Sequence, residues 1–414
     1  MGKLEKFGGY SKIIGKSNNI FLVTNTKDAT INDGLELAAI LDSNGKYLTK
    51  SLPIYYFMKD SETTWEPING KFSDFIRIDQ KNTTRDGLIG LAIGDALGVP
   101  LEFMKREDVK HANIKDMIGK EDDVNIDGMW SNFIPAGAWS DDTSMTIATM
   151  DTIIKNDGAI NYDNIMQGFI SWWKDGKYIS SDEPFGLGST VSHALDCYVG
   201  GIPSLECGGK NFRDNGNGAI MRIFPFSLYT IALDMDEEET VDFINKASGI
   251  THGHDISKMS CFIYTEFLKC LIITKNPKIA YQYITSIDYG NYYSKIAIEA
   301  HSKLLMPNFL LYTDDDIPEN NGYVVVTLES AIHCLISTDN FEDAILKSIN
   351  LGYDTDTVGA VTGSLAGVLY GYNNIPDRWI NKIKKKEELE TIAENYENIL
   401  NSIQKKNMSE VKSH

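Results

Sequence analysis

The sequence predicts a mainly α-helical protein with a small α+β extension at its N-terminus. From Arg85 onwards, one segment after another places apolar residues at helical spacing, and convincing strands are few. Before that point, short β-branched and aromatic runs alternate with Asn, Gly, Asp and Pro, which is typical of strands joined by turns. The 414 residues, 42% of them hydrophobic, suit one large domain and a smaller one. We therefore expect the extension over residues 1–82, a helical domain over 83–405 and a flexible tail over 406–414.

Within the extension, four runs are expected to be strands because they are rich in β-branched and aromatic residues. They are NNIFLVTNT (18–26), GKYLTKSLPIYYFM (45–58), TTWEPI (63–68) and FSDFIRI (72–78). The run GLELAAIL, residues 34–41, is expected to be a short helix.

The helical domain shows no repeat of fixed period. Its apolar periodicity predicts helices over residues 86–99, 143–156, 162–175, 237–248, 258–273, 278–284, 293–305, 323–335, 341–351, 358–370 and 389–404.

Two of these helices carry glycine stripes, formed by Gly87, Gly90, Gly94 and Gly98 in the first and by Gly359, Gly363, Gly367 and Gly371 in the second. A glycine inside a helix costs about 1 kcal/mol relative to alanine, so eight of them require an explanation. Close approach of two helix backbones is one, because small residues permit it. Chance, in a chain with 34 glycines, is the alternative.

Acidic clusters stand at the start of two helices, and they are Ser140-Asp141-Asp142-Thr143 and Asp354-Thr355-Asp356-Thr357. Helix capping is one interpretation, since Asp, Ser and Thr are preferred N-caps and acids favour the positive end of a helix. However, one capping residue per helix would suffice. Four carboxylates brought together repel unless a cation neutralises them, and oxygen ligands select Mg²⁺, Mn²⁺ or Ca²⁺. Both interpretations stay open at this point.

Two further acids belong to the first glycine helix or follow it. If the striped helices contact each other, Glu102 can approach both acidic clusters and act as a metal ligand or general acid/base. Taken alone, an acid that follows a proline is more often a solvated surface group. Asp95, inside the helix, would need a buried partner, and a structural hydrogen bond to a nearby backbone or hydroxyl group is the simplest one.

Glycine-rich loops occur at Asp214–Ala219 (DNGNGA) and at Phe185–Thr190 (FGLGST), the latter before a helix. Successive glycines let backbone N–H groups approach an anion, although neither loop is a Walker or Rossmann motif and a plain turn is the alternative. His252 and His254 form an H-x-H pair without a third nitrogen or sulfur ligand nearby. No G-x-S-x-G elbow is present.

Composition narrows the classes of partner. The formal net charge of −19 argues against binding to DNA or RNA, which needs clustered Lys and Arg. Five scattered cysteines without a C-x-x-C pair argue against a disulfide framework. The N-terminal residues lack a signal-peptide core, and no apolar run reaches the roughly 18 residues of a membrane helix. We expect a cytoplasmic protein that contacts no membrane.

Six motifs occur in an order that resembles the ADP-ribosylglycohydrolase family, especially its bacterial dinitrogenase-reductase-activating type of ADP-ribosylarginine hydrolase. They are RDGLIGLAIGDALGVPLEF, GAWSDDTSM, FGLGSTV, DNGNGAIMR, THGHD and LGYDTDTVGAVTGSLAGVLYG. The resemblance covers residues 84–405 and leaves residues 1–80 outside. It implies an all-helical catalytic domain around two Mg²⁺ or Mn²⁺ ions.

The resemblance also implies roles for individual residues. The metal-ligand positions match Ser140, Asp141, Asp142, Asp354, Asp356 and Thr357, and the positions that line the substrate cleft match Phe185, Gly186, Gly188, Asn215, Gly216, Asn217, Gly218 and His252. Glu102 matches a glutamate that gates or assists catalysis, and both it and Asp142 are candidates for delivering a proton to the leaving group.

Three positions depart from the family pattern. Ser140 stands where the family usually has Thr, and its hydroxyl preserves the ligand role. Tyr353 replaces a common glycine. Gly186 stands where related arginine hydrolases often have an Asp that is expected to meet the guanidinium, so another acid would have to serve here.

The expected activity is hydrolysis of the N-glycosidic bond between ADP-ribose and a protein arginine, which reverses an ADP-ribosyltransferase. Two alternatives remain. The extension resembles those of immunity proteins that block an ADP-ribosyltransferase toxin sterically, so residues 1–82 are expected to bind such a toxin. The bond cleaved could also be serine-linked ADP-ribose or O-acetyl-ADP-ribose. We expect a monomer, because the catalytic site of this family needs no second chain.

Overall fold

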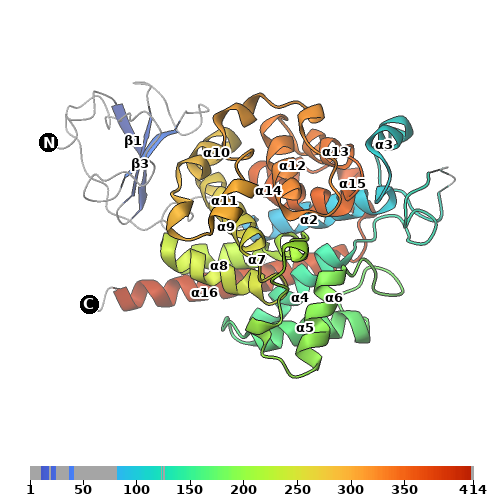
Figure 1. Cartoon of the computed structure of the whole chain (residues 1–414), viewed down its shortest axis with the longest axis horizontal. Coiled ribbons are helices and arrows are strands. Elements are labelled where there is room, and N and C mark those ends of the chain that lie inside the picture. Colours follow the sequence, from blue (N-terminus) through green and yellow to red (C-terminus); the bar gives the residue numbers. More distant parts are fainter. Residues whose placement is uncertain are drawn as a thin grey trace, which may run out of the picture.

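A computed structural model describes residues 82–122, 124 and 126–411, with side chains as far as 407, and three short strands nearer the N-terminus (Figure 1). The helices make up the large domain, and the strands form a separate small sheet. The predicted mainly α-helical fold is therefore confirmed.

The sheet contains β1 (Ser11–Ser17), β2 (Ile20–Thr24) and β3 (Leu37–Leu41), all antiparallel and in the order β1-β2-β3. The strand expected over 18–26 is confirmed by β2. The helix expected over 34–41 is wrong, because its last five residues are β3. A short apolar run does not distinguish helix from strand, and pairing with β2 decides the outcome here. The runs at 45–58, 63–68 and 72–78 lie outside the described residues.

The α-helices of the large domain are α2 (Thr83–Gly98), α3 (Arg106–Ala112), α4 (Asp141–Lys155), α5 (Tyr162–Asp175), α6 (Ser189–Val199), α7 (Phe224–Ala232), α8 (Glu237–Gly249), α9 (Asp255–Thr274), α10 (Pro277–Ser286), α11 (Lys295–Ala300), α12 (Val324–Ile336), α13 (Phe341–Ile349), α14 (Thr355–Tyr370), α15 (Asp377–Lys382) and α16 (Lys386–Val411). Short 3₁₀ turns connect them, among which η3 (Val99–Leu101), η5 (Phe212–Asp214) and η6 (Ile220–Arg222) lie near the site described below.

Each of the eleven predicted helical segments contains a helix, with two notable differences in length. Helix α11 is much shorter than the expected 293–305, and α16 continues to Val411, into the expected tail. Helices α3, α7 and α15 were not expected. Helix α7 is buried along its whole length, so it lacks the alternation of polar and apolar residues that reveals an amphipathic helix. Helices α3 and α15 have only seven and six residues.

Helices α2 and α14 lie side by side in the middle of the large domain, where the other helices surround them (Figure 1). The glycine stripes explain how they approach so closely. A Cβ atom on Gly94 would overlap the carbonyl oxygen of Gly359, and a Cβ atom on Gly363 would overlap that of Gly90. Backbone therefore contacts backbone. The hypothesis of close helix approach holds, and chance does not explain the stripes.

Two of the eight glycines have other roles. A Cβ atom on Gly87 would overlap the ring of Phe224 on α7, and Gly371 ends α14 with a positive φ of 79°.

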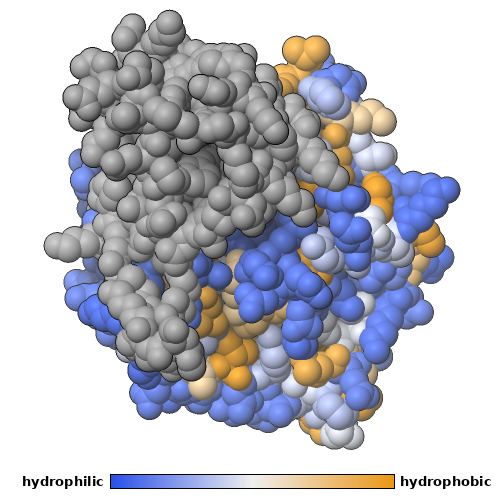
Figure 2. All heavy atoms as spheres, turned by 90° about the vertical axis from the view of Figure 1, so that its left-hand side faces the viewer, coloured by the Kyte–Doolittle hydropathy of each residue, from blue (hydrophilic) through white to orange (hydrophobic). Residues whose placement is uncertain are grey.

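None of the described helices is by itself long and apolar enough to cross a membrane. Within the described part of the chain, one bent pair, Thr83–Leu101 and Arg106–Ala112, meets that test jointly, and it does so by length and composition alone. The five cysteines are free thiols. On the face drawn in Figure 2, apolar residues outside the grey atoms form small groups between hydrophilic ones.

Candidate active site

The crossing of α2 and α14 brings Glu102 close to the acidic cluster at the start of α14. The helices run antiparallel, so the C-terminal end of α2, followed by Glu102, meets the N-terminal end of α14 with its acidic cluster. The Thr355 hydroxyl donates a 2.7 Å hydrogen bond to the Gly98 carbonyl and ties the two ends together. Glycine spacing thus places Glu102 beside Asp354 and Asp356.

Asp95 brings the second acidic cluster to the same place. Its carboxylate accepts hydrogen bonds from the Ser140 backbone N–H at 2.9 Å and from the Thr143 backbone N–H at 3.1 Å. It also accepts a 2.6 Å hydrogen bond from the Thr143 hydroxyl. Asp95 on α2 thus satisfies the free N–H groups of α4 from outside that helix, in the manner of an N-cap. The structural role expected for Asp95 is what the structure shows.

Capping therefore does not explain the cluster at α4. Ser140 is the N-cap residue, yet its side chain makes no capping hydrogen bond. Its hydroxyl donates instead to Asp142 Oδ2 at 3.1 Å, and the Thr357 hydroxyl of α14 donates to the same oxygen at 3.4 Å. The two clusters are thereby connected across the helices.

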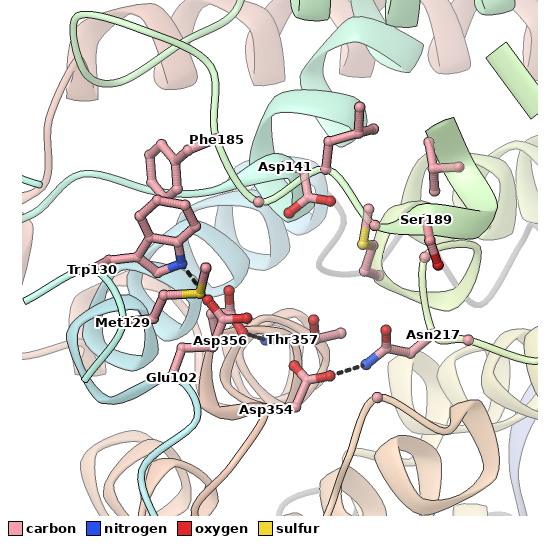
Figure 3. Close-up of a pocket in the computed structure, with 18 of the residues that line it drawn as sticks. Glu102, Met129, Trp130, Asp141, Phe185, Ser189, Asn217, Asp354, Asp356 and Thr357 are labelled. Atoms are coloured by element: carbon pink, nitrogen blue, oxygen red, sulfur yellow. Dashed lines mark hydrogen bonds between the residues drawn. The ribbon is translucent and has the colours of Figure 1, made fainter. Parts of the chain in front are cut away.

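These residues surround a cavity of about 1320 Å³ (Figure 3). Of the residues expected to form the site, those lining the cavity are Glu102, Asp141, Phe185, Gly186, Gly188, Asn215, Gly216, Asn217, Gly218, His252, Asp354, Asp356 and Thr357. In Figure 3, Asp141 and Asp354 face the cavity from opposite sides. Ser140 and Asp142 are buried and do not line it. Asp142 is thus less well placed than Glu102 to deliver a proton to a ligand.

The carboxylates make the cavity strongly acidic. Burial raises the pKa of Glu102 to about 8, with the charges of Asp354 and Asp95 adding to the shift. Burial also raises the pKa of Asp141, Asp142 and Asp356 well above their ordinary value, again with help from neighbouring carboxylates. Within the described residues, no Lys, Arg or His forms an ion pair with any of the six acids named in this paragraph. The cluster can be neutralised only by protons or by an added cation.

The chemistry of this donor set fits a hard divalent cation. All candidate donors are carboxylate or hydroxyl oxygens, which Mg²⁺ and Mn²⁺ prefer. Asp142 Oδ1 is buried without a hydrogen-bond partner, although an oxygen of this kind normally has one. Among the described residues, no three His, Cys, Asp or Glu side chains already stand in metal-holding geometry. Binding would therefore require the carboxylates to turn towards the ion.

Trp130, which the sequence did not reveal, stands beside Glu102 and forms an aromatic wall together with the expected Phe185. The indole N–H of Trp130 donates a hydrogen bond to Glu102 Oε2, and the Trp130 ring lies 5.1 Å from that of Phe185 between centroids (Figure 3). Trp130 thus holds the carboxyl group in place and extends the surface of Phe185. It lies in a loop without periodicity, so no pattern in the sequence marked it.

Asn215 and Asn217 are anchors of the DNGNG loop. Asn217 Nδ2 donates to Asp354 Oδ2 at 2.9 Å and to the Thr327 hydroxyl at 3.0 Å. Asn215 Oδ1 accepts from the Ser257 hydroxyl at 2.9 Å. With both amides engaged, the loop is fixed between α12, α9 and the acidic cluster. Gly216 and Gly218 line the cavity between these anchors, so their backbone is accessible to a ligand.

The two histidines of the H-x-H pair have separate roles and do not form a metal site. His252 is buried, with Nδ1 3.0 Å from the Thr251 hydroxyl, which accepts a 2.7 Å hydrogen bond from Arg222. Burial, and then the charge of Arg222, lower the pKa of His252 to about 3, so it is neutral. His254 caps α9 by accepting from the Ile256 N–H at 3.2 Å.

Two of the three departures from the family pattern have a structural meaning. Tyr353 has a φ of 61°, in the left-handed region that glycine adopts most easily, so the backbone here suits the glycine that the resemblance leads us to expect. Gly186 has a φ of 90°, and a Cβ atom on it would overlap Asp141 Oδ1. With Asp141 in this position, an Asp side chain has no room at residue 186.

The fold and the cavity together define a class of protein, namely an all-helical enzyme whose pocket sets clustered carboxylates against a glycine-rich loop. A family model described as ADP-ribosylglycohydrolase matches residues 77–407. The chain is 31% identical over 312 residues to "ADP-ribosylarginine hydrolase Tri1" of Serratia proteamaculans, covering 75% of this chain and 77% of the relative.

Another relative is the "ADP-ribosyl-[dinitrogen reductase] glycohydrolase" of Rhodospirillum rubrum, 28% identical over 73% of this chain and 90% of that one. A solved structure titled "ADP-ribosylglycohydrolase-related protein complex" shares the fold, with a TM-score of 0.61 and 23% identity over 78% of this chain and 99% of that one. The chain belongs to the ADP-ribosylglycohydrolase family and is a hydrolase of that family.

Proposed function

We propose that this protein removes ADP-ribose from modified arginine side chains of proteins by hydrolysing the N-glycosidic bond. One observation carries the proposal: Glu102, Asp141, Asp354 and Asp356 share a single large cavity with the DNGNG loop. A carboxyl group that keeps its proton near neutral pH serves acid catalysis, and a glycine-rich loop suits a diphosphate. The relatives named for ADP-ribosylarginine hydrolysis support arginine as the modified residue.

The proposed reaction exchanges one bond for another. The oxygen of a water molecule bonds to the anomeric carbon of the ribose, the bond from that carbon to the guanidine nitrogen breaks, and the nitrogen receives a proton from an acid of the site. The attacking water gives up one proton as its oxygen becomes the hydroxyl of the product, and that proton returns to the acid, so the enzyme is restored. Glu102 is the proposed donor, since burial raises its pKa to about 8 and it lines the cavity. Phe185 and Trp130 offer a flat surface to the substrate, and neutral His252 supports the loop without adding charge.

Two Mg²⁺ or Mn²⁺ ions complete the proposal. Ser140, Asp141, Asp142, Asp354, Asp356 and Thr357 would hold them after side-chain rearrangement. Such ions would supply Lewis acidity and a more acidic bound water.

To test the proposal, the protein is incubated with ADP-ribosylarginine in the presence of Mg²⁺ or of a chelator, and the released ADP-ribose is measured by chromatography. We expect turnover with Mg²⁺ and its loss in Glu102→Gln and Asp142→Ala, whereas Glu329→Gln, a buried acid outside the cavity, stays active. No release from the wild type, or equal release by Asp142→Ala, would reject it. Serine-linked peptides and O-acetyl-ADP-ribose, assayed in parallel, show whether another bond is preferred.

A second role, protection against an ADP-ribosyltransferase toxin, is suggested by the N-terminal 76 residues that the family match leaves out. Protection through hydrolysis would end in full-length Glu102→Gln. Protection through steric blocking by the extension would persist in that variant, and binding of the toxin would be measurable with it.

A further inference from the structure

Among the residues that the structure describes, exposed Phe and Trp side chains are concentrated at one place. Within the described residues, every exposed Phe or Trp lines the mouth of the active-site cavity, namely Phe103, Phe133, Trp173 and Phe212, exposed by 58%, 68%, 38% and 67%. Met129, exposed by 50%, joins them. We call these five side chains the apolar rim. Elsewhere in the described part, the exposed large apolar residues are aliphatic, and none of them lines the cavity.

The rim is built from four separate parts of the chain. Phe103 follows η3, Met129 and Phe133 belong to the loop before α4, Trp173 lies near the end of α5, and Phe212 begins η5. Sequence neighbours therefore do not explain the gathering. Isolated exposed apolar residues are common, but a group around one cavity indicates an interaction site.

Three of the five rim residues have ring or backbone contacts although they are exposed. The ring of Phe212 makes an edge-on contact with His254 at 6.2 Å, and Trp173 lies 5.6 Å from Trp172 between ring centroids. The Phe133 N–H donates to the Trp130 carbonyl at 3.0 Å. A surface that is ordered before binding loses less entropy when a partner arrives.

The position of the rim determines what can occupy it. The acidic cluster and the asparagines of the DNGNG loop line the same cavity but are buried, and they suit the polar, charged ADP-ribose. When a modified side chain enters, the polypeptide that carries it must stay at the mouth, in contact with the rim. Aromatic residues are the most frequent anchors in such contacts.

We propose that the apolar rim binds apolar side chains that flank the modified residue of the protein substrate, so that the enzyme selects the sequence around the modification. This rests on the proposed function for the cleavage step, whereas the binding step stands without it.

Two peptides with a single ADP-ribosylarginine test the proposal, one with leucines and one with serines on both sides. The wild type is expected to cleave the leucine peptide with about tenfold higher kcat/KM, mainly through KM, a factor typical of one or two anchor contacts. In Phe133→Ser/Phe212→Ser the preference is expected to disappear, whereas cleavage of free ADP-ribosylarginine stays within about twofold. Ile296→Ser/Leu311→Ser, which removes exposed apolar side chains away from the cavity, is the matched control and keeps the preference.

Binding of the unmodified leucine and serine peptides, followed by fluorescence anisotropy, separates the two proposals. If the wild type binds the leucine peptide preferentially and Phe133→Ser/Phe212→Ser abolishes this preference, the rim is supported even when no peptide is cleaved. An absence of cleavage would then reject only the hydrolase function. Equal cleavage and equal binding of the two peptides by the wild type would overturn the rim as a substrate surface. A dimer that dissociates in the rim variant would also overturn it, in favour of self-association.

Discussion

Two buried clusters of polar side chains, one around Glu266 on α9 and one at the active-site cavity, differ in how the charge of their carboxylates is compensated. On α9, Glu266 forms a 2.8 Å ion pair with Lys269 and accepts a 2.6 Å hydrogen bond from the Tyr283 hydroxyl. Lys269 in turn donates to the Thr240 hydroxyl at 2.6 Å. At the active-site cavity, buried carboxylates face one another and no described basic side chain pairs with them. The first group is compensated within the fold, whereas the second is left open for something that is not part of the chain.

The largest effect that this comparison predicts concerns the compensated group. Lys269→Met removes the ammonium and leaves Glu266 buried without its cation, so the free energy of unfolding is expected to fall by about 3–5 kcal/mol. Urea denaturation measures the change. The double variant Glu266→Gln/Lys269→Met should recover part of the loss, since it removes the stranded charge. A loss below about 1 kcal/mol in Lys269→Met would show that the pair is not a structural unit.

A buried carboxylate outside both groups allows a pH test. Burial raises the pKa of Glu329 on α12 to about 7, and the charge of Lys303 opposes the shift. The native state thus binds this proton more tightly than the unfolded state, whose pKa is close to 4.5. Stability from this group is fully present below pH 4.5 and is lost as the pH rises to about 7, by up to about 3 kcal/mol.

Glu329→Gln should therefore flatten the dependence of the unfolding free energy on pH between about 4.5 and 7, as followed by denaturant titrations at several pH values. The control is Glu342→Gln, which replaces the exposed acid of the Arg378–Glu342 ion pair and should leave this pH dependence unchanged. An unchanged slope in Glu329→Gln would mean that its carboxyl group ionises as it does in water.

At the active-site cavity, removing a charge is expected to raise the free energy of unfolding, whereas Lys269→Met lowers it. Asp142 is fully buried beside Asp95, Asp141 and Asp354, so Asp142→Asn removes repulsion while keeping the shape of the side chain. In chelator, the variant is expected to be more stable than the wild type by about 1–2 kcal/mol and to lack hydrolase activity, the trade-off typical of active-site charges. Thermal unfolding and ADP-ribose release measure both effects.

Added Mg²⁺ sharpens this test. If ions bind the cluster, Mg²⁺ raises the melting temperature of the wild type more than that of Asp142→Asn, because binding to the native state stabilises it in proportion to affinity. A variant that is less stable than the wild type in chelator would show that Asp142 is a structural residue, comparable to Glu266.

The crossing of α2 and α14 and the position of Glu102 could be predicted from the sequence, because particular residues mark them. The stripes at Gly90, Gly94, Gly359 and Gly363 predicted a close crossing, because glycine at helical spacing has few other uses. That crossing in turn placed Glu102 near the acidic cluster of α14. Local patterns of this kind can be read from one segment at a time.

Contacts between distant segments could not be predicted in the same way. Asp95 caps α4 from 45 residues away, and Trp130 reaches Glu102 from a loop 28 residues further along the chain. Strand β3 depends on pairing with β2, since its apolar residues alone suit a helix equally well. Asp142 belongs to a recognisable motif, but only the folded chain shows that it lies beneath the cavity instead of on its surface.

The smallest predicted effect concerns the backbone that supports the open cluster. Helix α9, which carries the compensated pair, is regular, whereas Phe103 and Tyr353 beside the cavity both have left-handed backbone, with φ of 64° and 61°. They are joined by a hydrogen bond from the Phe103 N–H to the Tyr353 carbonyl at 2.6 Å. The bond connects the segments of Glu102 and Asp354, and it keeps two non-glycine residues in a strained conformation.

Tyr353→Gly relieves the strain at one of these residues, while the added flexibility of the unfolded chain offsets part of the gain. We expect the unfolding free energy to rise by no more than about 1 kcal/mol, with activity retained because the backbone path to Asp354 is unchanged. Tyr353→Ala is the matched variant, since it removes the same ring but keeps the strain, and it should not be stabilised. If both variants lose stability equally, packing of the Tyr353 side chain contributes more to the free energy of unfolding than the backbone strain costs. The segment that carries Asp354 would then be held mainly by that packing.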